Sequence, residues 1–450
     1  MLSSLVYIFA LSRYSGEVIL CVSVLTWLFG KWIGGLRKSG HGRRAAFVTF
    51  IAVSLSVLSL ILFKYFPVLK PLMKLDESEL SFLKLALPTG YSFFIFQVIS
   101  YLVDVCRAEE EKAYGFVDVL LYLCWFPKYI SGPIERGHDF LPQIEKVRKV
   151  IFLDMSRWGR IVSYFLTGCF YKVVIADRAG IYVNRLFDEH QEYGGFWLAI
   201  GAFLYSIQIY CDFAGYSYMA IGISAIFDID LTQNFRMPYL SANITEFWRR
   251  WHISLSSWLK DYLYIPLGGN RKGDIRKIMN TFLVFLVCGM WHGAGSGFLV
   301  WGLMHGLYSA VDILMRELSF NTLRKGFWGR VYTFLIVTFA WIFFRASSAE
   351  AAVEYIWDMF TVGIRVHGIT AEAASLGLDG WEIKTLLILL FSLLVMEFSA
   401  YKLKRPVPEL LNRSHYTVRC LAAFVLTSVL IVFGIYGPDF KSSDMIYMQF

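Results

Sequence analysis

Long apolar runs recur along the whole chain. Measured against the roughly 20 residues that cross a bilayer as a helix, ten of them span or nearly span: 17–36, 45–66, 81–106, 116–133, 160–176, 194–227, 279–315, 330–346, 383–402 and 417–437. Only 17% of the 450 residues are charged, whereas about a quarter of a soluble domain is charged. The sequence therefore predicts an all-α polytopic membrane protein and excludes a soluble one.

Two of these runs, 194–227 and 279–315, are too long for one span, so we expect each to hold two helical pieces. In total we expect about ten to twelve membrane helices in one domain over 1–450, some of them broken or re-entrant. The N-terminus lacks a basic region and an A-x-A-like cleavage site, so the first helix is expected to act as an uncleaved anchor.

Basic loops predict the orientation. The segments 31–44, 134–160 and 236–277 are rich in lysine and arginine, and short loops of this kind stay in the cytoplasm. Counting spans from the first loop puts the basic residues on both sides of 116–133 in the cytoplasm, so this run cannot cross the membrane a single time. We expect it to dip into the membrane and return, or to lie buried. The formal charge of +8 then indicates loops facing anionic lipid, and it predicts no nucleic-acid partner.

The seven cysteines are scattered and show no CxxC pair. They are typical of small buried apolar residues, and we expect neither a disulfide nor a metal site.

Residues that carry chemistry concentrate between 208 and 305. Asp212 lies inside an apolar run, where a carboxylate normally faces a bundle interior and is paired. Two interpretations stay open: Asp212 caps a broken helix and holds the fold, or it takes part directly in catalysis.

A polar block from Asn243 to His252 is expected to begin an interfacial helix over about 243–263. Asn243 can cap this helix with Glu246 as its reciprocal partner, and its tryptophans suit the headgroup level of a membrane. His252 stands between Trp251 and Ile253 rather than among exposed charges. It is a functional candidate, and the alternative of a satisfied hydrogen-bonding residue stays open.

His292 is the stronger candidate. It follows an apolar stretch and precedes Gly293, Gly295 and Gly297, small residues that let helices approach or leave room for a ligand. A neutral imidazole at that depth suits a general base. The alternative is a histidine that bridges two helices, and His305 is expected to be structural.

Several longer strings resemble the membrane-bound O-acyltransferase (MBOAT) superfamily, and more narrowly its bacterial alginate O-acetyltransferase branch. The strongest is FWRRWHISLSSWLKDYLYIPLGGNR from Phe247 to Arg271, followed by MWHG at 290–293 and WGLMHG at 301–306. Further similarity lies at 87–93, 126–134, 210–217, 341–346 and 446–450. Tyr218 departs from the pattern, which has an aspartate at this position.

The resemblance implies a bundle with re-entrant and interfacial helices around a central tunnel, where a cytoplasmic acyl donor meets an extracytoplasmic acceptor. It implies that His292 matches the family's essential histidine and that His252 matches its second polar position. His292 would act as general base, while His252 would orient the thioester or relay the proton. The residues expected to bind substrate are Trp248, Arg249, Arg250, Trp251, Trp258, Asp212 and Trp291. The two arginines either attract an anionic donor or simply anchor a cytoplasmic loop.

The expected function is acyl transfer in a bacterial cytoplasmic membrane. An acyl group, expected to be acetyl, would move from acetyl-coenzyme A or an acyl carrier thioester to a hydroxyl of an exported or cell-wall polysaccharide. No tightly bound cofactor is expected. The transfer would be direct or would pass through an extracytoplasmic acyltransferase or polysaccharide machinery. Two alternatives remain: transfer of D-alanine toward teichoic acid, and, from another class, a transporter or flippase, although no internal repeat favours the latter.

Overall fold

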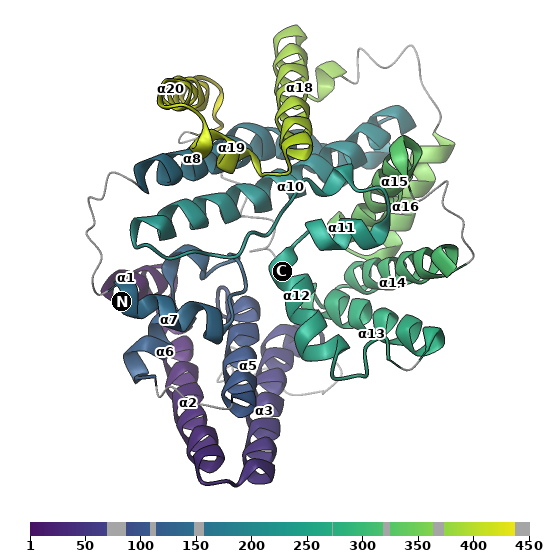
Figure 1. Ribbon diagram of the computed structural model, residues 1–450. Coiled ribbons are helices and arrows are strands. Elements are labelled where there is room, and N and C mark those ends of the chain that lie inside the picture. The colour runs from purple at the N-terminus through teal and green to yellow at the C-terminus, as the bar shows by residue number, and fades with distance from the viewer. Residues whose placement is uncertain are drawn as a thin grey trace, which may run out of the picture. The chain divides into compact units, whose positions relative to one another are not determined.

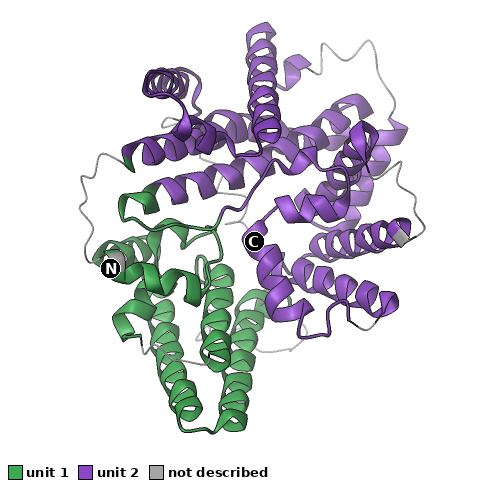
Figure 2. Ribbon diagram, viewed as in Figure 1, with its two compact units in different colours: residues 1–157, 223–232 green, residues 158–222, 233–450 purple. Residues whose placement is uncertain are grey.

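The computed structural model describes residues 1–69, 87–108, 114–147, 157–271, 273–317, 325–362 and 373–436. Every regular element in these ranges is a helix (Figure 1). The chain forms two compact units, one of residues 1–157 with 223–232, the other of 158–222 with 233–450 (Figure 2). Every candidate residue named above belongs to the second unit.

Eight helices in the described residues are long and apolar enough to cross a membrane. They cover Arg13–Lys38, Gly42–Phe66, Trp158–Asp188, Gly195–Ile226, Ser296–Arg316, Gly326–Arg345, Gly380–Leu403 and Tyr416–Phe433. The predicted class, an all-α polytopic membrane protein, is confirmed. The eight are fewer than the ten to twelve expected; α5 and α13, with 17 and 19 residues, are not among them.

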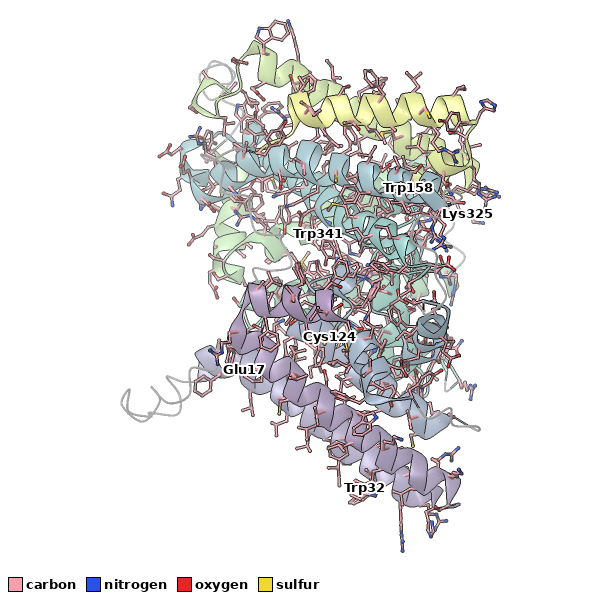
Figure 3. All side chains as sticks on the ribbon, turned by 90° about the vertical axis from the view of Figure 1, so that its left-hand side faces the viewer. Glu17, Trp32, Cys124, Trp158, Lys325 and Trp341 are labelled. Atoms are coloured by element: carbon pink, nitrogen blue, oxygen red, sulfur yellow. The ribbon has the colours of Figure 1, made fainter. Side chains whose placement is uncertain are left out.

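The first unit is built on α1 (Leu2–Leu11), α2 (Arg13–Lys38), α3 (Gly42–Leu69) and α5 (Tyr91–Arg107), with α2, α3 and α5 packed on one another. The outer sides of α2 and α3 are apolar. Trp32, labelled in Figure 3, is 57% exposed and Phe50 is 68% exposed. Such side chains suit contact with lipid because the bilayer is as apolar as they are.

The run at 116–133 does not cross as one helix, as predicted. It forms α6 (Phe116–Leu123), too short at about 12 Å for a bilayer, and a 3-10 turn η2 (Phe126–Lys128) before α7 (Gly137–Val147). Its core is buried, including Lys128, whose ammonium donates to the backbone carbonyl of Tyr122 over 2.7 Å and to the side chain of Gln97. The segment 223–232 joins this unit, because Thr232 donates to the carboxylate of Glu135.

The second unit begins with α8 (Trp158–Cys169), a π-helical turn η4 (Phe170–Ala176) and α9 (Asp177–Asp188), followed by η5 (His190–Glu192) and α10 (Gly195–Ile226). The prediction of two pieces in 194–227 is wrong, because α10 is continuous over 32 residues, about 48 Å. Its Gly215 does not break the helix. It lets α8 approach: a Cβ there would lie 2.8 Å from the carbonyl oxygen of Gly168.

The run at 279–315 does hold two helices, as predicted: α13 (Asp274–His292) and α14 (Ser296–Glu317). They form a tight hairpin in which Gly289 and Gly302 face each other. A Cβ on Gly289 would lie 2.5 Å from the carbonyl oxygen of Phe298, and one on Gly302 equally close to that of Phe285.

The unit is completed by the short elements η6 (Pro238–Leu240), α11 (Ile244–Arg250), α12 (Ile253–Leu259) and the π turn η7 (Lys260–Tyr264), and by five later helices. These are α15 (Gly326–Arg345), α16 (Ala349–Thr361), α18 (Gly380–Leu403), α19 (Val407–Arg413) and α20 (Tyr416–Phe433).

Candidate active site

The helix predicted from Asn243 starts as expected. The side chain of Asn243 accepts a hydrogen bond from the backbone N–H of Glu246 over 2.9 Å. The side chain of Glu246 accepts a hydrogen bond from the backbone N–H of Ala242 over 2.8 Å, one residue before the position that a regular capping box uses. Both interactions satisfy donors at a helix start that would otherwise lack a partner.

The prediction of one helix over 243–263 is wrong, because the chain breaks at His252. This residue has a φ of 42° and lies in the left-handed region, between α11 and α12. The break is held from outside: Arg236 donates to the carbonyl of Arg250 over 3.0 Å, and Ile253 donates to that of Asn234 over 2.9 Å. The non-glycine left-handed conformation costs about 1–3 kcal/mol and persists only where surrounding contacts impose it.

Asn234 therefore has a structural role in the site that the sequence did not indicate. Its side chain accepts from the backbone N–H of Ser254 over 3.3 Å and donates to the hydroxyl of Ser217 over 3.1 Å. These bonds join the break at His252 to α10. No motif distinguishes Asn234 among the asparagines of the chain.

The break turns His252 into the interior. Its side chain is 1% exposed, and its ring meets that of Phe213 edge-on at 4.6 Å between centroids. Burial lowers the pKa of His252 to about 3. At neutral pH this imidazole is therefore uncharged and suited to hydrogen bonding or proton relay rather than to binding an anion.

His292 is the last residue of α13 and is also buried. Its ring lies 5.1 Å from that of Trp301 and 5.0 Å from that of Phe344, both edge-on. The C-terminal end of a helix carries partial negative charge, which stabilises the positive charge that a base acquires.

The two candidate histidines share a neighbour. The ring of Trp291 lies 4.8 Å from that of His292 and 6.5 Å from that of His252. His252 and His292 are far apart in the sequence, one in the α11–α12 break and the other at the end of α13. The structure brings them together, with Trp291 between them.

A third imidazole belongs to the same cluster. His305 on α14 lies 4.9 Å from Trp301, the ring that also contacts His292. The indole N–H of Trp248 donates to Nδ1 of His305 over 3.2 Å. Nδ1 therefore carries no proton, and Trp248, one of the residues expected to bind substrate, orients His305. Trp301 begins the WGLMHG string at 301–306, and nothing local in the sequence indicates its contacts with two imidazoles.

We call the rings of Trp248, Trp251, Trp291, Trp301, Trp341 and Phe344 with the three histidines the aromatic cluster. Trp251 packs in its core, 5.0 Å from Trp341, which is fully buried and labelled in Figure 3. Trp258 lies on α12 and packs against Tyr262 at 5.0 Å.

The two arginines of α11 differ. Arg250 forms an ion pair with Glu246 at 2.5 Å and lies over the ring of Tyr401. Arg249 is exposed, and within the described part of the chain it has no ion-pair partner. Arg249 is thus the one of the two arginines that remains available to an anionic substrate.

Asp212 is paired, as predicted for a carboxylate in an apolar run. Lys172 lies 2.6 Å from Asp212 and 2.8 Å from Asp177, and all three side chains are largely buried. The suggestion that Asp212 caps a broken helix is wrong, because α10 is continuous through it. Tyr218, where the family pattern has an aspartate, is buried and packs against Tyr164 and Tyr171.

The glycines after His292 do not act alike. A Cβ on Gly293 would lie 2.3 Å from the ring of Phe298, and one on Gly297 would lie 2.4 Å from the carbonyl oxygen of Phe343. These two allow close approach, as predicted. Gly295 has no atom nearer than 3.7 Å to such a Cβ, so close packing does not require it.

The chain is similar to known proteins along most of its length. The family model for MBOAT, membrane-bound O-acyltransferase family, matches residues 19–350. The probable alginate O-acetylase AlgI of Pseudomonas fluorescens is 37% identical over 328 residues, 72% of this chain and 63% of that protein. The peptidoglycan O-acetyltransferase of Helicobacter pylori is 36% identical over 66% of this chain and 62% of its own length.

A more distant relative is the teichoic acid D-alanyltransferase of Bacillus subtilis, 29% identical over 65% of this chain and 74% of that protein. The chain spans somewhat less than two thirds of the length of the alginate O-acetylase quoted above. Because the family model covers well over half of the chain, including α10 to α15 and all three histidines, the chain belongs to the membrane-bound O-acyltransferase family.

Proposed function

We propose that the protein is a membrane O-acyltransferase of the bacterial cytoplasmic membrane. It moves an acetyl group from a cytoplasmic thioester to a hydroxyl of an exported or cell-wall polysaccharide, directly or through an extracytoplasmic partner. The observation that carries the proposal is the position of His292 at the end of α13, in a buried aromatic cluster and next to the tryptophan that also contacts His252.

In the proposed reaction, His292 takes the proton of the acceptor hydroxyl while the oxygen attacks the thioester carbonyl. The new bond joins oxygen to the acyl carbon, the bond between this carbon and sulfur breaks, and the proton passes from His292 to the leaving thiolate. General-base assistance is worth about 10²- to 10⁴-fold. The helix end stabilises the transient imidazolium, and the aromatic walls exclude the water that would hydrolyse the thioester.

His252 and Trp291 serve this reaction by position. The neutral His252 orients the thioester or relays the proton, and Trp291 fixes the spacing between the two imidazoles. Arg249 attracts the phosphates of coenzyme A or an acidic carrier protein through charge complementarity. The positive charge of the segment 236–277, which contains Arg249, supports a cytoplasmic position for this residue.

Acetyl is favoured over D-alanyl by the relatives. Proteins named for O-acetylation match at 36–39% identity, and those named for D-alanyl transfer match at 26–29%. The same names support an acceptor in an exported or cell-wall polysaccharide.

Product analysis of the cell envelope tests the proposal. Cells that lack the gene would receive the wild type or His292→Ala at matched membrane levels, and ester-linked acetate and D-alanine would be released by mild base and quantified. The wild type should restore acetate and His292→Ala should not. Restoration of D-alanine alone would replace the acetyl assignment by the D-alanyl one, and restoration of neither ester would contradict acyl transfer.

A further inference from the structure

A pocket of about 490 Å³ lies between α10, α15 and α18, and none of the three histidines of the aromatic cluster lines it. Most of its wall is hydrocarbon, including Phe203, Ile207, Phe334, Leu390 and Leu394. One carboxylate, that of Glu397, also lines it, together with the phenols of Tyr210 and Tyr239. The acyl-transfer proposal uses none of these residues.

Glu397 is held in a fixed position. It lies near the C-terminal end of α18, which meets α10 there (Figure 1), and it is only 9% exposed. Its Oε1 accepts a hydrogen bond from the hydroxyl of Tyr171 and another from that of Tyr210, each over 2.8 Å. Its Oε2 has no hydrogen-bond partner among the described residues. A carboxylate in an apolar site is costly unless a donor or a cation faces it.

A cation from α15, Arg330, contacts α18 one helical turn beyond Glu397. Tyr401 follows Glu397 by four residues, a separation of about 5–6 Å between Cβ atoms. Arg330 on α15 donates from Nη2 to the hydroxyl of Tyr401 over 2.9 Å and from Nε to the carbonyl of Leu240 over 3.2 Å; Leu240 itself lines the pocket. No carboxylate of the described residues forms an ion pair with Arg330, whereas Arg250, on the same tyrosine ring, is neutralised by Glu246.

The outer wall of the pocket is exposed and apolar. On α18, Leu387, Phe391 and Leu394 line the pocket and are 60%, 66% and 57% exposed. This helix is long and apolar enough to cross a bilayer. A membrane lipid in contact with α18 can therefore place a chain in the pocket without crossing a polar surface.

We propose that this pocket is a binding site for phosphatidylethanolamine. The ammonium group donates to Oε2 of Glu397, the phosphate accepts from Arg330, and one acyl chain fills the apolar part of the pocket. The carboxylate lies on α18, and the guanidinium of α15 bonds to Tyr401 one turn away, so the two groups offer an acceptor and a donor to the two charges of a zwitterionic headgroup. Phosphatidylglycerol lacks the cation, and phosphatidylcholine carries a cation that has no N–H to donate.

Native mass spectrometry of the purified full chain in detergent tests the site. The protein would be offered equal amounts of phosphatidylethanolamine, phosphatidylglycerol and phosphatidylcholine, and bound lipid would be quantified. The wild type should retain phosphatidylethanolamine in preference to the other two. Glu397→Gln keeps an oxygen for both tyrosines and loses the charge, so its affinity for this lipid should fall about 10-fold, the loss of one charge-assisted hydrogen bond.

Glu354 on α16 is exposed and offers a matched control, so Glu354→Gln should keep the preference. Arg330→Gln should weaken all three phospholipids, because the phosphate is common to them. The unfolding temperature of each variant without added lipid checks that the fold is retained. Equal binding of the three lipids by the wild type, or an unchanged preference in a folded Glu397→Gln, would overturn the proposal. Neither result bears on acetyl transfer, which is measured separately.

Discussion

At the scale of single residues, similar side chains have different roles because of their surroundings. His252 and His292 are both buried, but His252 lies in a strained break and His292 at a helix end that favours positive charge. Arg249 and Arg250 are adjacent, yet only Arg250 has an ion-pair partner. The sequence identified all four residues. It could not assign the surroundings of His252, because Asn234 and Phe213 reach the break only through the fold. The pairing of Arg250 is a local feature, since Glu246 precedes it by four residues on the same helix.

The arginine pair gives a prediction about donor binding. Arg249→Ala should raise KM for the thioester donor several-fold with little change in kcat, because it removes a charge that binds ground state and transition state alike. Arg250→Ala should instead lower the unfolding temperature, because it leaves the half-buried carboxylate of Glu246 without its ion-pair partner. Steady-state kinetics at two salt concentrations and thermal unfolding separate the two effects. Identical behaviour of the two variants would contradict the assignment.

Burial of His252 gives a prediction about pH. Its pKa is lowered from about 6.5 in the unfolded chain to about 3 in the fold, so the unfolded state binds a proton first as pH falls. The stabilisation from keeping His252 neutral is therefore complete above pH ~6.5 and is lost below it, by up to about 1.4 kcal/mol per pH unit.

His252→Asn removes this titration and keeps a residue that tolerates the left-handed region. Between pH 7 and pH 5 the unfolding temperature of the wild type should therefore fall more than that of the variant. Parallel pH profiles for the two proteins would show that His252 is accessible to protons in the folded state.

At the scale of elements, apolar runs predicted helices well and breaks poorly. The helices at 13–38, 326–345, 380–403 and 416–433 lie where runs were found, and the hairpin within 279–315 was expected. The expected break in 194–227 is absent, and the break at His252 was not expected. The break in 194–227 was expected only because this apolar run is longer than one membrane span. Backbone pairing with Asn234 and Arg236 imposes the second, and no local propensity reveals it.

The α13–α14 hairpin gives a prediction about packing. Gly302→Ala places a methyl group where a Cβ meets the carbonyl oxygen of Phe285 at 2.5 Å, so α13 and α14 must separate. This change should lower the unfolding temperature by several degrees and displace His292, reducing kcat. Gly35→Ala in α2 is the control: its Cβ meets nothing within 4 Å, and alanine favours a helix, so stability should be unchanged or slightly higher. Comparable unfolding temperatures for the two variants would contradict the close packing.

At the scale of the whole molecule, the membrane class and the family could be predicted from the sequence, because hydropathy and the long motif from Phe247 to Arg271 are local features. The aromatic cluster could be predicted only in part. The sequence analysis identified the three histidines with Trp248, Trp251 and Trp291, but Trp301, Trp341 and Phe344 come from α14 and α15 and join the cluster only after folding. The division into two compact units left no sign in the sequence, since no composition typical of a linker marks their boundary.

The central claim is that His292 deprotonates an acceptor hydroxyl beside a thioester. The most direct measurement is acetyl transfer by the purified protein in lipid vesicles, from radiolabelled acetyl-coenzyme A to an oligosaccharide acceptor. The wild type should transfer label, and His292→Ala should lose about 10²- to 10⁴-fold in kcat at an unchanged unfolding temperature. A folded His292→Ala that transfers acetyl at the wild-type rate would contradict the account.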